Sequence, residues 1–229
     1  MSELLPINEV FESVQGEGYW TGTPAVFIRL QGCDVGCPWC DTKHTWHHDF
    51  TYAVPKEEML AKPGDAPTFA TLSVEELLDV CAKGPRHVVI TGGEPCDNDL
   101  VPLTLALNAA GHTVQIETSG TSHVRVAEAA WVTLSPKIDM PGGKTVRPDA
   151  LARANEIKMP VGKPDDIIKL TELLATMPRK AAQGDSHAFA LVWLQPLSQS
   201  AKATALCVYE ATKRDWRLSL QTHKYMGVR

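Results

Sequence analysis

The sequence lacks several features that would place a protein in a membrane, outside the cell or along a nucleic acid. No apolar run is long enough to cross a bilayer, and the start MSELLP lacks the basic residues and apolar core of a signal peptide. Lysine and arginine (22) are outnumbered by aspartate and glutamate (27), and the formal net charge of −5 argues against a broad nucleic-acid surface. We therefore expect a cytoplasmic chain that binds neither membranes nor nucleic acid directly.

Cysteine is also scarce, with six residues in 229, which argues against a disulfide framework. Cys81, Cys96 and Cys207 are isolated along the chain. Cys81 and Cys207 lie in helical patterns, where a cysteine more often fills apolar space than binds a ligand. The other three fall together in residues 33–40, and in a reducing compartment such a group indicates metal binding or catalysis.

The three clustered cysteines, Cys33, Cys37 and Cys40, have the spacing C-x3-C-x2-C and directly follow the apolar run 25–30. That run predicts a buried strand, so the cysteines occupy a loop at its carboxyl end, where α/β proteins collect ligands. Three thiolates can bind zinc, with a fourth ligand or an open position, or three irons of a four-iron cluster. Zinc, a disulfide with a spare thiol and three unconnected cysteines remain as alternatives. The cluster is favoured because zinc sites usually contain a second C-x2-C pair.

The alternation of strand-like and helical segments predicts an α/β fold with a mainly parallel sheet and right-handed crossovers. The units are too few for a closed eight-fold barrel, so we expect an open or partial (β/α) barrel in one domain spanning residues 1–229. The expected strands cover residues 25–30, 87–91, 113–117, 131–134, 157–159, 188–194 and 217–221. The expected helices cover residues 73–83, 99–110, 165–177 and 198–214. The first is expected to open with the capping box Ser73-x-x-Glu76, and the second with Asn98 as its cap. Residues 45–71 interrupt the alternation as an expected insertion, and residues 179–186 as a polar connector.

Two further motifs fall where expected strands end, as a single site at one mouth of a barrel requires. In Thr91-Gly92-Gly93-Glu94-Pro95 the glycines let a ligand approach the backbone, and Glu94 offers an acceptor for an ammonium group. A tight turn with a solvated glutamate would give the same pattern. Ser135-Pro136-Lys137 offers a hydroxyl and an ammonium for a carboxylate, although the pattern alone favours a lysine on an exposed turn.

Other strand ends carry weaker signals of the same kind. In Gln195-Pro196-Leu197-Ser198 the glutamine could bind an adenine or ribose edge, while Ser198 could simply cap the next helix. Asp41-Thr42 offers oxygen donors of the kind that Mg²⁺ prefers, or forms an ordinary turn. Three single residues complete the set: Arg29 as a fork for a carboxylate, Glu117 as an acid, and His223 as an acid–base or hydrogen-bond donor. Surface or packing roles are their alternatives.

Taken together, these motifs resemble the 7-carboxy-7-deazaguanine synthase family, radical S-adenosylmethionine (SAM) enzymes of the queuosine pathway of tRNA modification. The cysteine motif alone is typical only of the radical SAM superfamily, and the combination is specific to the family. The resemblance covers nearly the whole chain and includes residues 8–11, 15–18, 33–46, 91–95, 116–120, 135–137 and 218–225.

The resemblance implies a partial (β/α) barrel of the radical SAM type, a homodimer and a lyase. The lyase would convert 6-carboxy-5,6,7,8-tetrahydropterin to 7-carboxy-7-deazaguanine with loss of ammonia. A [4Fe–4S] cluster on Cys33, Cys37 and Cys40 would cleave SAM, and the 5′-deoxyadenosyl radical would abstract hydrogen from the pterin before SAM is regenerated. Mg²⁺ and a reductant such as flavodoxin or ferredoxin would take part. The protein would mainly bind, orient and shield.

The resemblance also implies roles for individual residues. The implied SAM contacts are Trp39, Cys40, Asp41, Gly93, Ser135, Pro136, Lys137, Gln195, Pro196, Leu197 and Ser198. The implied pterin contacts are Val14, Gln15, Gly16, Arg29, Thr91, Glu117 and His223, and Thr42 would contact Mg²⁺. The tail departs from the family pattern, because Lys224-Tyr225 precedes Met-Gly-Val-Arg instead of Leu-Asn-Ile and a small residue. The length matches, so the carboxylate of Arg229 could still reach the substrate, although its charged side chain argues against this.

Two competing hypotheses remain. A different radical SAM enzyme, such as a glycyl-radical activase, would share the cluster and SAM contacts but bind a protein. The Gln-Gly-Glu-Gly start and the Thr-His-Lys-Tyr end argue against it. A zinc-stabilised, non-enzymatic binding module would be colourless and would leave the Gly-Gly-Glu and Ser-Pro-Lys motifs unexplained.

Overall fold

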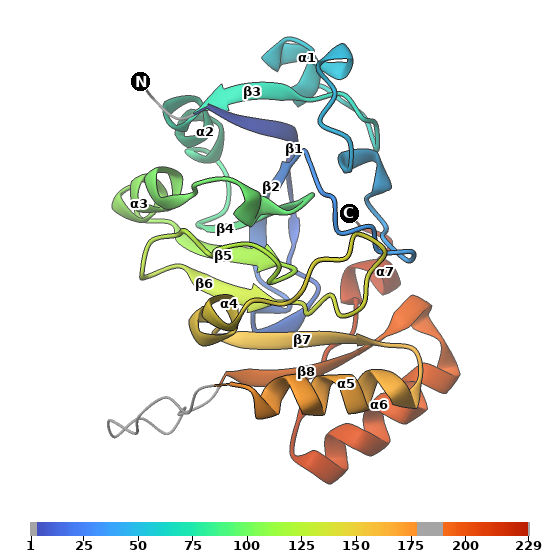
Figure 1. The fold of residues 1–229 in the computed structure, drawn as a ribbon. Coiled ribbons are helices and arrows are strands. Elements are labelled where there is room, and N and C mark those ends of the chain that lie inside the picture. The colour runs from blue at the N-terminus through green and yellow to red at the C-terminus, as the bar shows by residue number, and fades with distance from the viewer. Residues whose placement is uncertain (1–3, 178–189, 229) are drawn as a thin grey trace.

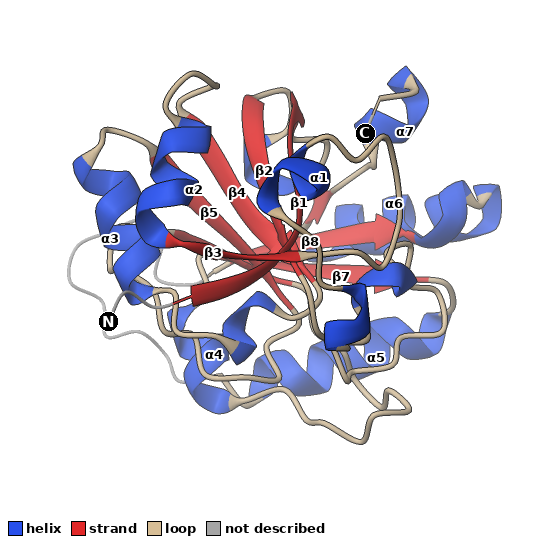
Figure 2. Cartoon of the chain, turned by 90° about the horizontal axis from the view of Figure 1, so that it is seen from above, coloured by secondary structure: helices blue, strands red, loops and turns tan. Residues whose placement is uncertain are grey.

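A computed structural model describes residues 4–177 and 190–228, which form one nine-stranded sheet with helices around its outside (Figure 1). The strand order is β3-β1-β2-β4-β5-β6-β7-β8-β9. β1 is antiparallel to both of its neighbours, and every pair from β2 to β9 is parallel. Seen from above, the strands cross the middle of the molecule and the helices lie outside them (Figure 2). The sheet curls but does not close, because β3 and β9 pair with no strand on their outer edges in the described residues.

The element bounds follow the predicted alternation closely in the middle of the chain. The strands are β1 (Leu4–Val14), β2 (Pro24–Leu30), β3 (Ala70–Ser73), β4 (His87–Gly92), β5 (Thr113–Thr118), β6 (Trp131–Leu134), β7 (Glu156–Val161), β8 (Leu191–Pro196) and β9 (Arg217–Leu218). The helices are α1 (Lys56–Leu60), α2 (Val74–Cys81), α3 (Val101–Ala109), α4 (Pro148–Arg153), α5 (Pro164–Ala175), α6 (Ala201–Arg214) and α7 (Thr222–Met226). The predicted connector 179–186 and the start of the strand predicted at 188–194 lie outside the described residues.

The strand β1 was not predicted, because the first expected strand was residues 25–30. Its sequence, LLPINEVFESV, contains a proline and polar residues that break a simple apolar alternation. Asn8 and Glu9 are nevertheless buried, because Asn8 Nδ2 donates to Gln31 Oε1 at 2.7 Å and Glu9 Oε1 accepts from Arg29 Nε at 2.6 Å. A register shift between Ile7 and Glu9 also interrupts the pattern. Polar partners from other segments therefore stabilise a strand that its own sequence does not reveal.

Helix ends were predicted with mixed success. The capping box of Ser73 and Glu76 at the start of α2 is confirmed. The caps proposed at Asn98 and Ser198 are wrong. The helix α3 begins at Val101, whose N–H bonds the carboxylate of Asp99, and α6 is capped by Ser200. Ser198 has a left-handed backbone (φ +55°) in a separate short turn before that helix.

The predicted insertion, residues 45–71, contains short elements only. The helix α1 lies in it, with a 3-10 turn at Phe50–Tyr52 and the start of β3. Met59 and Phe69 from this segment are buried, and β3 pairs with β1. The segment thus packs into the core and leads into β3, the strand at one edge of the sheet.

Side chains alternate along the parallel strands between a helix-facing core and the inside of the curled sheet. Val26, Ile28, Val88 and Ile90 belong to the apolar core on the helix side. Their neighbours in sequence, exemplified by Arg29, line an internal cavity. Because the side-chain period of a strand is two, each strand contributes one apolar face to the core and one face to the cavity.

Within residues 4–177 and 190–228, no helix combines the length and apolar character needed to cross a bilayer.

We predict that Gly93→Ala destabilises the protein. A Cβ at this position would lie well under 3.0 Å from the carbonyl oxygen of Gly32, and a backbone atom cannot move aside cheaply. Overpacking of this kind costs about 1–3 kcal/mol, which urea unfolding of the metal-free protein would measure. Gly64→Ala is the matched control, because nothing lies within 4 Å of its Cβ. Equal stabilities of the two variants would contradict the prediction.

Candidate active site

One cavity of about 330 Å³ occupies the inside of the sheet at the carboxyl ends of the parallel strands. It brings together nearly all of the residues predicted from the sequence. Its lining includes Val14, Gln15, Gly16, Arg29, Cys33, Cys37, Trp39, Cys40, Asp41, Thr42, Thr91, Gly93, Glu117, Ser135, Lys137, Gln195, Leu197, Ser198 and His223. Pro136 and Pro196 are not among the lining residues and lie beside others that are.

The three-cysteine loop forms part of the cavity wall, and its thiols are free. The indole Nε1 of Trp46 donates to the Sγ of Cys40 at 3.3 Å, and Cys40 N donates to the carbonyl of Cys37 at 3.1 Å. Burial raises the pKa of Cys33 to about 11 and also raises that of Cys37. A bound metal would be needed to stabilise these groups as thiolates, since metal binding is linked to proton release. Three thiols in one short loop fit an iron–sulfur cluster that keeps one iron for a non-protein ligand.

The residues predicted to contact SAM approach this loop from three strand ends. Gly93 N donates to the carbonyl of Leu30 at 2.9 Å, which holds the loop after β4 against β2. Lys137 Nζ donates to Ser135 Oγ at 2.7 Å, so the hydroxyl and the ammonium act as one unit. Burial lowers the pKa of Lys137, and the adjacent Cys37 opposes the shift. The side chain of Gln195 accepts from Ser219 Oγ at 3.0 Å and is buried.

Glu94 lines the cavity, as its expected contact with an ammonium group requires, and it also makes contacts that were not predicted. Its carboxylate is buried and accepts three hydrogen bonds from the protein itself. Oε1 accepts from Thr118 Oγ1 at 2.6 Å and from Cys96 N at 3.0 Å, and Oε2 accepts from Ser119 N at 2.8 Å. A carboxylate offers about four acceptor positions, so these three bonds use most of them. Glu94 therefore joins the loop after β4 to the loop after β5.

The residues predicted to contact the pterin line the same cavity. Arg29 uses Nε for its bond to Glu9, and that bond leaves the two terminal nitrogens of the guanidinium for other acceptors. Gly16 lies against the ring of His223, and a Cβ on Gly16 would overlap the imidazole. Burial lowers the pKa of His223, while the charge of Glu17 opposes the shift. The short helix α7 thus packs on the loop that follows β1.

Three charged residues of the cavity were missed: Glu17, Lys158 and Lys224. Lys158 is buried, and its Nζ lies 2.5 Å from Glu17 Oε2 and 3.0 Å from Glu117 Oε2. The side chain of Lys158 is 5% exposed and each carboxylate 16%, so Glu17, Lys158 and Glu117 form one buried charge cluster. A signal existed in the sequence: Lys158 is a cation inside the apolar run 157–159.

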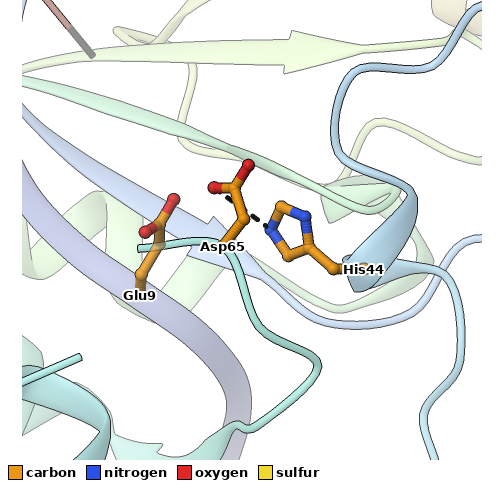
Figure 3. Close-up of side chains that lie close together, drawn as sticks. All are labelled: Glu9, His44 and Asp65. Carbon is orange, nitrogen blue, oxygen red and sulfur yellow. Dashed lines mark ion pairs between the residues drawn. The ribbon is translucent and has the colours of Figure 1, made fainter. Parts of the chain in front are cut away.

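A second group of ligand-type side chains lies beside the cavity (Figure 3). Glu9, His44 and Asp65 have ligand atoms within 4.8 Å of one another. Glu9 already pairs with Arg29 at 2.6 Å, and His44 Nε2 lies 3.9 Å from Asp65 Oδ1. Burial lowers the pKa of His44, so its contact with Asp65 is weak near neutral pH. Thr42, the residue predicted to contact Mg²⁺, instead lines the cavity with its Oγ1 3.5 Å from Cys40 Sγ.

Comparisons with known proteins give a consistent set of relatives. Residues 27–177 match the family model described as the radical SAM superfamily. A protein named 7-carboxy-7-deazaguanine synthase from Escherichia coli K12 is 51% identical over 97% of this chain and 98% of its own length. One of the same name from Buchnera aphidicola is 40% identical over 98% and 99%. The crystal structure of QueE from Escherichia coli superimposes with a TM-score of 0.88, covering 95% of this chain and 93% of the other. The predicted fold class is thereby confirmed.

We predict that Glu94→Gln destabilises the protein by about 1–3 kcal/mol. An amide has one acceptor oxygen, so either Cys96 N–H or Ser119 N–H would face an NH₂ group and lose its partner. Urea unfolding of the metal-free protein measures the change. Glu172→Gln, on the exposed face of α5, is the control with the same chemical change. An equally small effect at both positions would show that the Glu94 hydrogen bonds do not stabilise the fold.

Proposed function

The chain belongs to the radical SAM superfamily and, within it, to the 7-carboxy-7-deazaguanine synthase family, and from this membership we propose that it converts 6-carboxy-5,6,7,8-tetrahydropterin to 7-carboxy-7-deazaguanine and ammonia. The observation that carries the proposal is the position of the C-x3-C-x2-C loop on the wall of a polar internal cavity. Substrate and product differ only by NH₃, so the reaction needs no external oxidant.

The cofactors proposed are a [4Fe–4S] cluster and SAM. Cys33, Cys37 and Cys40 would hold the cluster, and the fourth iron would remain open for SAM. Together the two groups supply, when bound, the reductive cleavage that starts radical chemistry. The residues proposed to hold SAM are Trp39, Asp41, Gly93, Ser135, Pro136, Lys137 and Gln195 to Ser198. The Ser135–Lys137 pair supports this assignment, since an ammonium and a hydroxyl side by side suit a carboxylate.

The proposed substrate has two chemically different ends, and the cavity offers a partner for each. The guanidinium of Arg29 suits the carboxylate, because its terminal nitrogens are not used by Glu9. Glu17 suits the N–H donors of an aminopyrimidinone ring, and Glu117 beside it is a further proposed pterin contact. Val14, Gln15, Gly16, Thr91 and His223 complete the proposed pterin contacts.

Other parts of the proposal are supported more simply. Thr42 is proposed to help hold Mg²⁺ against the substrate carboxylate, because it lines the cavity beside Cys40. The proposed carboxylate contact of Arg229 lies outside the described residues. The six free thiols suit a reducing cytoplasm. We further propose a homodimer and a small redox protein, flavodoxin or ferredoxin, as the electron donor.

Anaerobic turnover tests the proposed reaction. The protein is reconstituted with iron and sulfide and given dithionite, SAM and 6-carboxy-tetrahydropterin, and the products are followed by mass spectrometry. The deazaguanine carboxylate should form with one ammonia per turnover and without matching loss of SAM. A brown protein that cleaves SAM but leaves the pterin intact would retain the superfamily and discard the substrate. A colourless protein holding zinc would overturn the enzyme reading altogether.

Single substitutions of the loop cysteines should abolish cluster binding. We predict that Cys33→Ala, Cys37→Ala and Cys40→Ala each lose the visible absorption of the cluster and reduce turnover to background, because no fourth thiol of the described residues lines the cavity. Bound iron per chain is measured after reconstitution. Cys207→Ala, which changes a buried thiol in α6, is the control and should keep the iron content of the wild type. Unchanged iron in any of the three loop variants would contradict the assignment.

A further inference from the structure

The buried charge cluster of Glu17, Lys158 and Glu117 is assembled from three distant parts of the chain. Glu17 follows β1, Glu117 lies in β5, and Lys158 lies in β7. All three line the cavity. One ammonium between two carboxylates leaves a formal charge of −1, which is costly for groups so far from solvent. The cluster therefore has a place for one further proton.

The two carboxylates are held differently. Glu17 accepts one bond on each oxygen, from Lys158 at 2.5 Å and from Gln221 Nε2 at 2.9 Å. In Glu117 the amide donors converge on Oε1, which accepts from Gln115 at 3.0 Å and Gln15 at 3.4 Å as well as from Lys158 at 3.1 Å. Among the residues that the structure describes, Oε2 of Glu117 accepts from Lys158 alone, at 3.0 Å. One oxygen of Glu117 is thus anchored, and the other has room for a proton or a ligand.

We propose that Glu117 Oε2 carries the proton that the departing ammonia requires, and that Lys158 is a positioning residue that keeps Glu17 ionised and Glu117 in this role. The inference rests on the proposed function. Ring contraction first joins the two carbon neighbours of the departing nitrogen and breaks one of its two C–N bonds, so that the nitrogen becomes an amine held by a single C–N bond. As this last bond breaks, its electron pair stays with nitrogen, and Glu117 gives its proton to the amine, which leaves as NH₃. The resulting carboxylate then takes a proton from the neighbouring ring carbon, and the C–H electron pair forms the new double bond. Glu117 is restored, and NH₃ is the only atom group lost.

The electrostatics of the cluster agree with this division of roles. Burial raises the pKa of Glu117 to about 7, the charges of Glu17 and Glu156 add to the shift, and Lys158 opposes it. Burial also raises the pKa of Glu17, but the ammonium and hydrogen bond of Lys158 outweigh it and bring the value to about 2. Lys158 itself remains charged, because its two carboxylates outweigh the burial that lowers its pKa.

Other titratable groups face the cluster from neighbouring elements. His223 in α7 acts on Glu17, and Lys137 after β6 is repelled by Lys158. His87 in β4 reaches the cluster through Gln115, whose Oε1 lies 3.0 Å from His87 Nε2. Burial lowers the pKa values of both histidines, so near neutral pH they add little positive charge. Lys158 is therefore the dominant cation acting on Glu117.

Two variants test the inference through the pH dependence of turnover. The wild type should lose activity above about pH 7 as Glu117 ionises. Without the ammonium, the proton should stay on Glu117 to higher pH. Lys158→Met should therefore raise the pH at which activity is lost by about one unit or more. Lys158→Arg should leave that pH unchanged. Glu117→Gln should lower kcat by about 100-fold or more, since it removes a general acid.

A measurement on the metal-free protein gives a second readout. The protein is labelled with [δ-¹³C]glutamate, and the Glu117 resonance is assigned by its loss in Glu117→Gln. The midpoint of its pH titration should lie near pH 7 in the wild type and higher in Lys158→Met. Because Lys158→Met leaves two buried carboxylates without a counter-ion, Lys158→Met/Glu17→Gln is made beside it and should show the same direction. Lys56→Met, which breaks an exposed pair with Glu76, is the control and should change neither readout.

The outcomes separate this inference from the proposed function. Product formed by the wild type, with a Glu117 midpoint near the ordinary value of about 4.3, would overturn the proton role alone. If activity is lost at the same pH in Lys158→Met as in the wild type, the positioning role of Lys158 is overturned. No product from the wild type with dithionite and the pterin would overturn the proposed function, and the proton role with it.

Discussion

The need to balance one buried ammonium constrains the inside of this molecule. Lys158 is only 5% exposed, and an unpaired charge at that depth would cost several kcal/mol. Glu17 and Glu117 must therefore lie on either side of it, and they bring the loop after β1 and the strand β5 to β7. Gln221 and Gln15 bond the same carboxylates, so the last strand end and the first loop meet there too. The loop after β1 and the segment after β9 are therefore joined on the inside of the sheet.

The loops at the strand ends are held by a second set of contacts made from backbone and buried acceptors. Glu94 bonds two loops at once, and Gly93 allows the chain to approach Gly32 more closely than any side chain would permit. These contacts preorganise the cavity wall on which Cys33, Cys37 and Cys40 lie. A cofactor that carries difficult chemistry needs such a wall more than it needs reactive side chains, because the protein has to orient it and keep water away.

The cavity contains charged groups of both signs, and they lie on different strands. Arg29 lies in β2, and the carboxylates of Glu17 and Glu117 lie at the lysine in β7. A substrate with a carboxylate at one end and N–H donors at the other would satisfy both groups. The proposed pterin has this character.

The sequence by itself determined the local parts. The middle strands, the capping box at Ser73 and the cysteine loop could all be predicted, because each depends on neighbours in sequence or on a fixed spacing. The tertiary structure decided the rest. β1 is stabilised by polar partners such as Gln31 and Arg29, and Glu94 links two loops in a way that its own sequence neighbourhood does not reveal. Lys158 was readable as an unusual cation in an apolar strand, but its two carboxylates come from segments more than 40 residues away. Burial makes such pairings obligatory, and only the folded chain shows which acid meets which base.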